Sequence, residues 1–267
     1  EEAGGIGAAM AALENPYPFR RDTAVIAEPT NLTPIIACEG SLMKRLTLYG
    51  RSAHAATPWE GESVLPHFDA IRDAFDRLAM QRNTEITHPL FEEYPTPWPV
   101  NIGTVSAGSW ASTVPASLTA EFRIGVAPME SVSEVEAQFD DQLQTVIEDR
   151  PWFSEYPPEF ERFSVQFEPS EIDSDETIVK AVQNALSDAG LDSYKPVRGA
   201  TYGTDARHYI TADIPTVVFG PGSIEQAHFP NETIQWDEVL QFGNLLTEVS
   251  KIYLKSTDST NAESPLQ

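Results

Sequence analysis

The chain has 267 residues, 41% of them hydrophobic, and its 41 acidic and 17 basic side chains give a formal net charge of −24. This charge argues against nucleic acid or an anionic membrane surface as a partner, because both are bound through basic patches. The single cysteine, Cys38, leaves no internal disulfide, and no apolar run is long enough to span a membrane. We therefore expect a globular cytoplasmic protein with one large domain or two of ordinary size.

Two adjacent carboxylates, Glu1 and Glu2, open the sequence and run directly into a glycine-rich turn. Such a pair is found at acidic helix starts and also in active sites. A helix-prone, alanine-rich stretch follows at residues 6–13, and residues 23–27 form a short apolar strand. Glu28 stands at the carboxyl end of this strand, where ligand-binding residues collect in parallel α/β sheets.

The middle of the chain alternates between strand and helix patterns. In chain order, the strand, helix, strand, strand, helix and strand are expected at residues 42–49, 64–78, 100–106, 118–126, 132–146 and 163–167. This β-α-β-β-α-β order is that of a split βαβ unit, in which two helices cover one face of four strands.

The last part of the chain returns to an α/β pattern. Asp173 or Ser174 is expected to cap a helix that carries apolar residues over 178–189. Residues 215–219 have the composition of a buried parallel strand, and a final helix is expected at 237–254, followed by an unstructured polar tail. The apolar face of the final helix comprises Val239, Leu240, Leu246 and Val249.

These patterns predict two domains. Residues 1–38 and 170–267 would form a single α/β domain, and residues 39–169 would be inserted into it. Both segments of the α/β domain carry candidate metal ligands, which are Glu2, Glu28 and His228. Carboxylate oxygen and imidazole nitrogen together suit zinc, with manganese and cobalt as alternatives. Taken singly, a glutamate such as Glu28 is more often a solvated carboxylate, and a histidine such as His228 more often has a structural role.

Local sequence around these residues strengthens the metal-site interpretation. Five segments stand in a distinctive order: Glu1-Glu2-Ala3-Gly4-Gly5-Ile6-Gly7, Ala27-Glu28-Pro29-Thr30, residues 50–58 (GRSAHAATP), residues 203–207 (GTDAR), and residues 219–222 (FGPG) with 227–232 (AHFPNE). With these segments the chain resembles the di-zinc aminoacylase/carboxypeptidase family, which includes acetylornithine deacetylase, succinyl-diaminopimelate desuccinylase and glutamate carboxypeptidase. The resemblance implies a metallopeptidase-type α/β catalytic domain interrupted by a ferredoxin-like split-βαβ domain. In the family that second domain serves as a lid and as the dimerisation surface of a homodimer.

The resemblance also implies roles for individual residues. Glu1 matches the general base, which takes a proton from the attacking water and later returns it to the leaving amine. Glu2 and Glu28 match carboxylate ligands of two different divalent metals, and His228 matches the histidine ligand on the metal that Glu2 binds. His54 matches a histidine that stabilises the oxyanion in the active site of the other subunit. As a bare residue, His54 would be a histidine of a surface loop.

Substrate-binding positions follow from the same resemblance. Arg123 matches an arginine that binds the substrate carboxylate, although an arginine on an exposed strand face is an equal alternative. Gly203, Thr204, Arg207 and Gly222 match pocket positions more loosely. Arg207 or Asp205 could instead belong to a structural ion pair. His67, His88 and His208 are expected to be solvated or structural.

Two departures from the family pattern bear on function. The family has an upstream segment that supplies a histidine ligand and a bridging aspartate, so we expect this chain to be a fragment of a longer or processed enzyme. Glu39 stands where some relatives carry arginine, and Ser112 stands where several carry asparagine. The negative charge at Glu39 argues against a dicarboxylate substrate and favours smaller N-acyl amino acids.

The sequence thus predicts a deacylase that hydrolyses N-acyl amino acids with two divalent metals, zinc first. A di-zinc dipeptidase or carboxypeptidase acting on short peptides is the alternative within the same chemistry. A third possibility is that the chain alone is a non-catalytic dimerising module, because the upstream ligands are missing from it.

Overall fold

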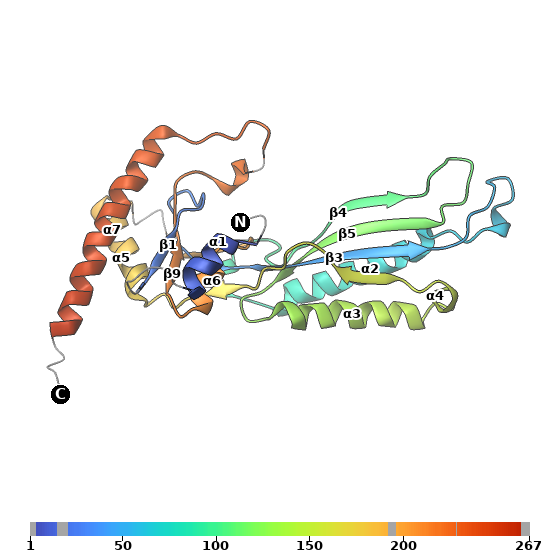
Figure 1. Cartoon of the computed structure of the whole chain (residues 1–267), viewed down its shortest axis with the longest axis horizontal. Coiled ribbons are helices and arrows are strands. Elements are labelled where there is room, and N and C mark those ends of the chain that lie inside the picture. The colour runs from blue at the N-terminus through green and yellow to red at the C-terminus, as the bar shows by residue number, and fades with distance from the viewer. Residues whose placement is uncertain (1–3, 15–20, 192–195, 228, 263–267) are drawn as a thin grey trace. The chain divides into compact units, whose positions relative to one another are not determined.

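The structure is a computed structural model in which the chain divides into two compact units (Figure 1). Unit 1 consists of residues 1–38 and 170–267, and unit 2 of residues 39–169. The described residues are 4–14, 21–191, 196–227 and 229–262. Three residues of the predicted site, Glu1, Glu2 and His228, lie outside them. None of the helices in these described ranges is long and apolar enough to cross a membrane.

Unit 1 is built on a small mixed sheet. Its strands are β1 (Ala24–Ile26), β2 (Ile35–Cys38), β7 (Ser170–Glu171), β8 (Arg198–Ala200) and β9 (Thr216–Val218). Strand β1 pairs in parallel with β9, while β2 runs antiparallel to β9 and β7 and parallel to β8. Because β1 and β9 are parallel, their carboxyl ends meet at one edge of the sheet.

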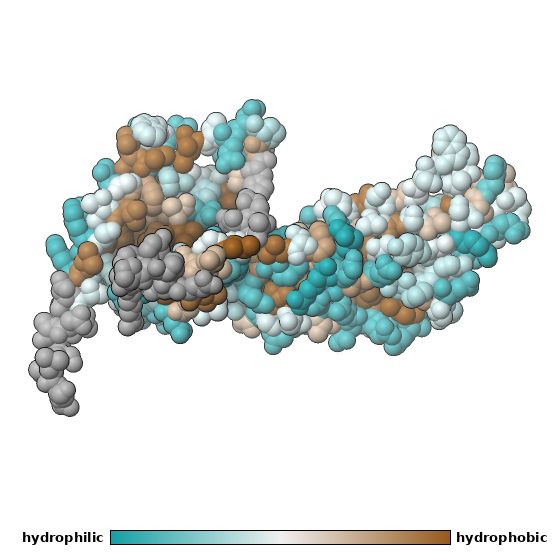
Figure 2. All heavy atoms as spheres, in the orientation of Figure 1, coloured by the Kyte–Doolittle hydropathy of each residue, from teal (hydrophilic) through white to brown (hydrophobic). Residues whose placement is uncertain are grey.

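Helices of unit 1 pack on this sheet and on one another. They are α1 (Ile6–Ala9), which continues as a π-helical turn (Met10–Glu14), α5 (Thr177–Asp188), α6 (Ala206–Thr211), a 3₁₀ turn (Ile224–Gln226) and α7 (Trp236–Ala262). Helix α5 buries the stripe Ile178, Val182 and Leu186, whose spacing places them on one face. It ends before Gly190, which adopts the left-handed φ of +72° that favours glycine. Figure 2 shows hydrophobic residues gathered on the surface of unit 1 near one end of α7.

Unit 2 is an antiparallel sheet with helices on one face (Figure 1). Its elements are β3 (Gly40–Tyr49), a 3₁₀ turn (Pro58–Glu60), α2 (Leu65–Glu85), a second 3₁₀ turn (Pro89–Phe91), β4 (Val100–Ala107), β5 (Ser117–Val126), α3 (Val132–Glu148), α4 (Trp152–Glu155) and β6 (Glu159–Arg162). The strand order is β4-β5-β3-β6.

A continuous apolar core joins the sheet of unit 2 to its helices. Alternate residues of β3, such as Leu42 and Leu46, are fully buried, as period-two alternation predicts for a sheet with one covered face. Phe75 of α2 packs edge-on against both Phe122 of β5 and Phe139 of α3. These rings lock both helices to the same face of the sheet.

Two sequence-based expectations about element boundaries are wrong. No strand forms at Phe163–Phe167, because Ser164 takes a positive φ of 58°; β6 lies just before, at Glu159–Arg162. The helix expected to be capped by Asp173 or Ser174 instead begins after Glu176, which provides no side-chain cap. The Asp173 carboxylate accepts a hydrogen bond from Asp175 N in the turn before it.

The last helix also differs from expectation. Helix α7 continues to Ala262, so part of the polar tail expected beyond residue 255 is helical. Its buried residues include Leu245 and Val249, whereas Leu240 is 52% exposed and Leu246 is 36% exposed. The short strands β2, β7 and β8 and the helix α6 were not expected from the sequence.

Candidate functional site

Glu28 lies at the carboxyl edge of the parallel β1–β9 pair, as its position after an apolar strand predicts. It follows β1 by two residues, and its backbone N–H donates to Ile26 O at 3.0 Å. Its carboxylate makes no hydrogen bond or ion pair with any residue that the structure describes. This leaves the carboxylate available as a ligand.

Thr30 ties the Glu28 segment to the loop after β9. Its hydroxyl donates to Gly220 O at 3.2 Å and accepts from Gly220 N at 3.1 Å. Leu32 N also donates to Gly220 O, at 3.0 Å, and Asn31 N donates to Gly222 O at 2.7 Å. These bonds fix the two segments against each other at the edge of the sheet.

Glycine is required at residue 220 for this close approach. A Cβ there would lie 2.5 Å from Glu28 O and 2.9 Å from Ala27 C, both backbone atoms that cannot move aside independently. Gly222, with a φ of +83°, also needs the freedom of glycine. The motif Gly-Pro-Gly is therefore what lets the Glu28 segment pack on the loop after β9.

A pocket of about 490 Å³ opens at this edge. It is lined by Ala27, Pro29, Pro221, Gly222, Ser223, Gln226, Glu232, Thr233 and Ile234. Residues on both sides of Glu28 therefore contribute to it, and so does the predicted pocket residue Gly222. Its lining mixes apolar rings and methyl groups with a few polar groups, which is typical of small-molecule sites.

The glycine-rich turn that follows Glu1-Glu2 is held by helix α6. The Gly4 carbonyl oxygen accepts from Arg207 Nη2 at 2.9 Å and lies 3.0 Å from His208 Nε2. Gly5 has a φ of +66°, and a Cβ on it would overlap the Asp205 carboxylate. Arg207 and His208 of α6 thus hold Gly4, and the Asp205 carboxylate fills the space beside Gly5.

Two of the predicted substrate-binding residues, Arg207 and Thr204, also have structural roles next to this turn. Arg207 is buried, and its second terminal nitrogen, Nη1, donates to Thr204 O at 2.8 Å. Thr204 is buried as well, and its hydroxyl accepts from Ala206 N and lies 3.5 Å from Cys38 Sγ. Gly203 precedes them in the same loop. Arg207 Nη1 lies 4.0 Å from Asp205 Oδ1, so these two side chains form the ion pair that was one alternative from the sequence.

His54 lies in unit 2, on an exposed loop that is paired with another loop. It forms an isolated bridge with Thr113, and Ala55 N donates to Ser112 O at 2.9 Å. His54 Nδ1 accepts a hydrogen bond from Ala56 N at 3.0 Å. In the neutral ring the proton is therefore on Nε2, which can act as a hydrogen-bond donor.

Arg123 lies in unit 2, on the sheet face opposite the helices. Its Nη2 donates to Glu39 Oε2 at 3.1 Å and its Nη1 to Glu39 Oε1 at 3.3 Å. The Arg123 side chain is 27% exposed, whereas Glu39 is fully buried. Burial raises the pKa of Glu39 to about 8, and the nearby Arg123 opposes this rise.

The described residues supply only part of a metal site. Among them, no group of three His, Cys, Asp or Glu side chains could hold a metal. Glu28 fits one ligand position by its free carboxylate and its place at a strand end. The other predicted ligands, Glu2 and His228, fall outside the described residues, which begin at Gly4 and include both neighbours of His228. His54 and Arg123 belong to the other unit.

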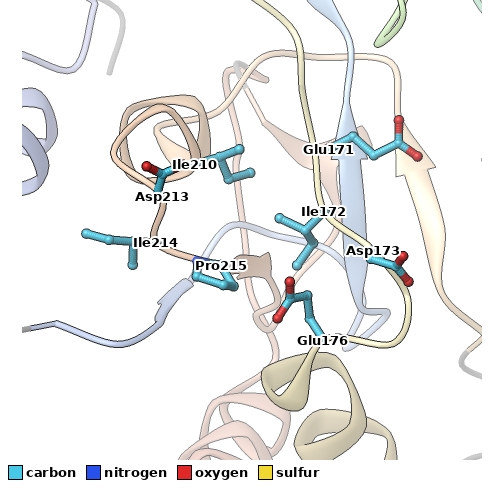
Figure 3. A pocket seen from close by; sticks show the side chains of 8 residues that line it. All are labelled: Glu171, Ile172, Asp173, Glu176, Ile210, Asp213, Ile214 and Pro215. Atoms are coloured by element: carbon cyan, nitrogen blue, oxygen red, sulfur yellow. The ribbon is translucent and has the colours of Figure 1, made fainter.

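A second pocket, of about 310 Å³, lies at the amino-terminal end of β9 and so away from Glu28 (Figure 3). Its lining includes the carboxylates of Glu171, Asp173, Glu176 and Asp213. Figure 3 shows the Glu171 and Asp213 carboxylates on opposite sides of the pocket rather than converging. The pocket therefore does not offer a compact set of ligands.

Sequence reasoning missed the supporting residue Thr30. Thr30 was visible as the last residue of the Ala-Glu-Pro-Thr segment, but only the structure reveals its two bonds to Gly220. His208 was expected to be solvated or structural, and its contact with Gly4 O is structural.

Comparison with known proteins adds two kinds of similarity. A family model described as Peptidase family M20/M25/M40 matches residues 1–251. Among curated proteins, acetylornithine deacetylase from Klebsiella pneumoniae (strain 342) is 27% identical over 235 residues, which cover 86% of this chain and 57% of that protein. The enzyme of the same name from Pectobacterium atrosepticum is 27% identical over 238 residues, with the same coverage. The chain thus spans a little over half the length of these relatives.

Solved structures show the same fold. A tripeptidase from Staphylococcus aureus superposes with a TM-score of 0.71 at 23% identity, covering 96% of this chain and 62% of the other. A metallo-carboxypeptidase of the M20 family from Sulfolobus solfataricus gives a TM-score of 0.67 at 14% identity, covering 93% of this chain and 66% of the other. The mixed α/β fold expected from the sequence is that of these proteins.

Proposed function

Because the chain belongs to peptidase family M20/M25/M40, we propose that it is part of a metal-dependent hydrolase that removes the acyl group from N-acyl amino acids. The observation that carries the proposal is the free Glu28 carboxylate at the carboxyl edge of β1 and β9, beside a pocket of about 490 Å³. The similarity to acetylornithine deacetylases supports the choice of an N-acyl amino acid over a peptide.

In this proposal Glu2, Glu28 and His228 are metal ligands. Two divalent metals, zinc first and cobalt or manganese as alternatives, would polarise the substrate carbonyl and acidify the attacking water. Glu1 would accept the proton of that water and return it to the leaving amine. Its place next to Glu2 suits this task, because the base and a ligand then approach the same water.

His54 would donate from Nε2 to the oxyanion that develops on the substrate carbonyl. The bond from Ala56 N to Nδ1 supports this role, since it leaves the proton on the exposed nitrogen. We propose that it acts on substrate in a second copy of the chain. Unit 2 would be the split-βαβ lid through which two copies dimerise, and its antiparallel order β4-β5-β3-β6 and exposed edge strand β4 support this.

Candidate substrate-binding residues are found in each unit. Gly222 lines the pocket beside Glu28, and Gly203, Thr204 and Arg207 form the loop that seats the Gly4-Gly5 turn. Arg123 is the candidate for the substrate carboxylate. Its contact with Glu39 means that this role must compete with an internal carboxylate.

The test is replacement of Glu1 in the complete protein. We expect Glu1→Ala to abolish turnover of N-acetyl amino acids while the metal content stays unchanged. Full activity in this variant would refute the role of Glu1.

The alternative function is that of a dipeptidase or carboxypeptidase. The structural similarity to a tripeptidase and to a carboxypeptidase is the observation that favours it. A screen of N-acetyl amino acids against dipeptides separates these activities. A non-catalytic dimerising module is the remaining alternative, and about two tightly held metals per chain would contradict it.

A further inference from the structure

The ion pair between Glu39 and Arg123 joins a fully buried carboxylate to a partly exposed arginine side chain. Glu39 has no exposed surface, and both of its oxygens contact terminal nitrogens of Arg123, at 3.1 and 3.3 Å. The Arg123 side chain keeps 27% of its surface in solvent. Part of the Arg123 side chain is therefore open to solvent on one side, while Glu39 contacts its guanidinium from the interior.

Gly125 makes room for the Glu39 carboxylate. A Cβ at this position would overlap Glu39 Oε1 and would lie 3.1 Å from Pro99 N. The φ of Gly125 does not require glycine, so the space is the reason for glycine at this position. The absence of a side chain at Gly125 therefore leaves the space that the Glu39 carboxyl group occupies.

A second ion pair in unit 2 provides a natural comparison. Arg82 of α2 donates to both oxygens of Glu130 at 2.8 Å, and it also donates to Gln138 and to Gly125 O. The Arg82 side chain is only 3% exposed, so no substrate can reach it. It is structural, whereas Arg123 is accessible.

We propose that Glu39 determines how strongly Arg123 binds a substrate carboxylate, because the two carboxyl groups compete for one guanidinium. This inference rests on the proposed function, in which Arg123 binds the carboxylate of an N-acyl amino acid. An ionised Glu39 neutralises Arg123 and weakens its attraction for a second anion. A protonated Glu39 accepts hydrogen bonds but leaves the positive charge for the substrate.

The charged groups around Glu39 place this competition near neutral pH. Arg123 on β5 and Arg82 on α2 both favour the ionised form, and Glu130 offsets the charge of Arg82. Burial outweighs these effects and raises the pKa of Glu39 to about 8. Substrate carboxylate binding should therefore be accompanied by protonation of Glu39, and it should weaken as the pH rises above this value.

The experiment measures binding by calorimetry in the complete protein carrying Glu1→Gln, so that no turnover is needed. The ligands are N-acetylalanine and its carboxamide, which lacks the carboxylate. With Glu39 intact, we expect N-acetylalanine to bind about five- to tenfold more weakly at pH 9 than at pH 6.5, the size of one charge-assisted hydrogen bond reduced by partial exposure. The carboxamide should show no such change.

Variants assign the effect to Glu39. Glu39→Gln should bind N-acetylalanine at pH 9 as tightly as the parent does at pH 6.5, because glutamine imitates the protonated acid. Glu136→Gln, which removes a partner of Lys44 and Arg162 elsewhere in unit 2, is the matched control, and it should keep the pH dependence of the parent even if it lowers stability. Arg123→Gln should remove the pH dependence and serves also if Glu39→Gln does not fold.

The results separate the two proposals. An identical pH dependence in Glu39→Gln, or none in the parent, would overturn the role of Glu39 while leaving the deacylase proposal intact. Failure of both ligands to bind at either pH would count against the proposed substrate class and, with it, against this inference.

Discussion

Replacement of Thr30 by valine tests whether the Glu28 segment is positioned by the loop after β9. Valine keeps the shape of threonine but removes the hydroxyl that bonds Gly220 O at 3.2 Å and Gly220 N at 3.1 Å. Thr30 is 7% exposed and Gly220 is buried, so water does not readily replace these bonds.

The cost follows from the two lost bonds. Gly220 O keeps Leu32 N as a donor, so its loss is small, whereas Gly220 N has no other acceptor among the described residues. A lost hydrogen bond costs about 1 kcal/mol and a buried N–H left without an acceptor a further 1–3 kcal/mol, so we expect the free energy of unfolding to fall by about 2–4 kcal/mol. Metal affinity should fall as well, because the Glu28 segment loses its side-chain attachment to Gly220 and keeps only its backbone bonds to the loop after β9.

Thr23→Val is the matched control. Thr23 Oγ1 donates to Pro215 O at 2.7 Å, across the same two strands but at their amino-terminal ends. Urea denaturation of the complete protein would measure stability, and competition with a zinc chelator would measure metal affinity. Thr23→Val should lower stability by about 1 kcal/mol without weakening metal binding. Equal loss of metal affinity in both variants, or none in Thr30→Val, would refute the reasoning.

Three further predictions follow from other parts of the structure. Gly5→Ala should lower the free energy of unfolding by at least about 1 kcal/mol, because the φ of +66° at Gly5 disfavours a side chain and the new Cβ would overlap Asp205. Denaturation and turnover assays should both detect the change, and wild-type behaviour would contradict the packing of this turn against Asp205. His54→Ala should lower kcat about 10²- to 10³-fold with metal content unchanged, and mixing it with Glu1→Ala should restore activity if His54 acts in a second copy; mixtures that stay inactive would count against that arrangement. Burial raises the pKa of Glu39 from 4.5 to about 8 in the folded state, so its contribution to stability is complete below pH 4.5 and is lost as the pH rises to about 8. The free energy of unfolding should therefore fall by up to about 1 kcal/mol per pH unit between these values. Glu39→Gln should not show this pH dependence of stability.

Elements with long, regular patterns were predictable from the sequence. Helices α2 and α3 and strands β3 and β5 each carry enough apolar residues at the right spacing to reveal their type and their buried face. Lys44 shows the limit of such patterns, because it takes a buried position in β3. It is stabilised there by Glu136 and Asp140 of α3, at 2.9 and 3.1 Å, which a strand pattern does not disclose.

The misplaced strand has a specific cause. Phe163, Val165 and Phe167 alternate as strand residues do, but the neighbour of β3 is the polar segment β6, at Glu159–Arg162. Its charged residues have partners: Glu161 stands opposite Arg45, and Arg162 pairs with Glu136. Partners from distant parts of the chain therefore decide the register, and local hydrophobicity does not contain that information.

The sequence motifs of the candidate site were recognisable, but the hydrogen bonds that hold its segments together were not. Glu28 was predicted as a ligand from a strand end and a family motif. The structure places it after β1, at the carboxyl end of the β1–β9 pair, and its role as a ligand stays a prediction. The bonds of Thr30 to Gly220 and of Arg207 to Gly4 join residues about 190 and 203 positions apart. Such contacts depend on the tertiary fold, so sequence patterns alone could not reveal that Arg207 holds Gly4 O.

Metal dependence of amide hydrolysis tests the central claim most directly. The measurement is the rate at which the complete protein hydrolyses N-acetyl amino acids before chelation, after removal of divalent metal, and after zinc is returned. We predict that activity disappears on chelation and returns with zinc, and that Glu28→Ala, which removes a proposed ligand, does not recover under the same treatment. Undiminished hydrolysis in the metal-free protein would contradict the account.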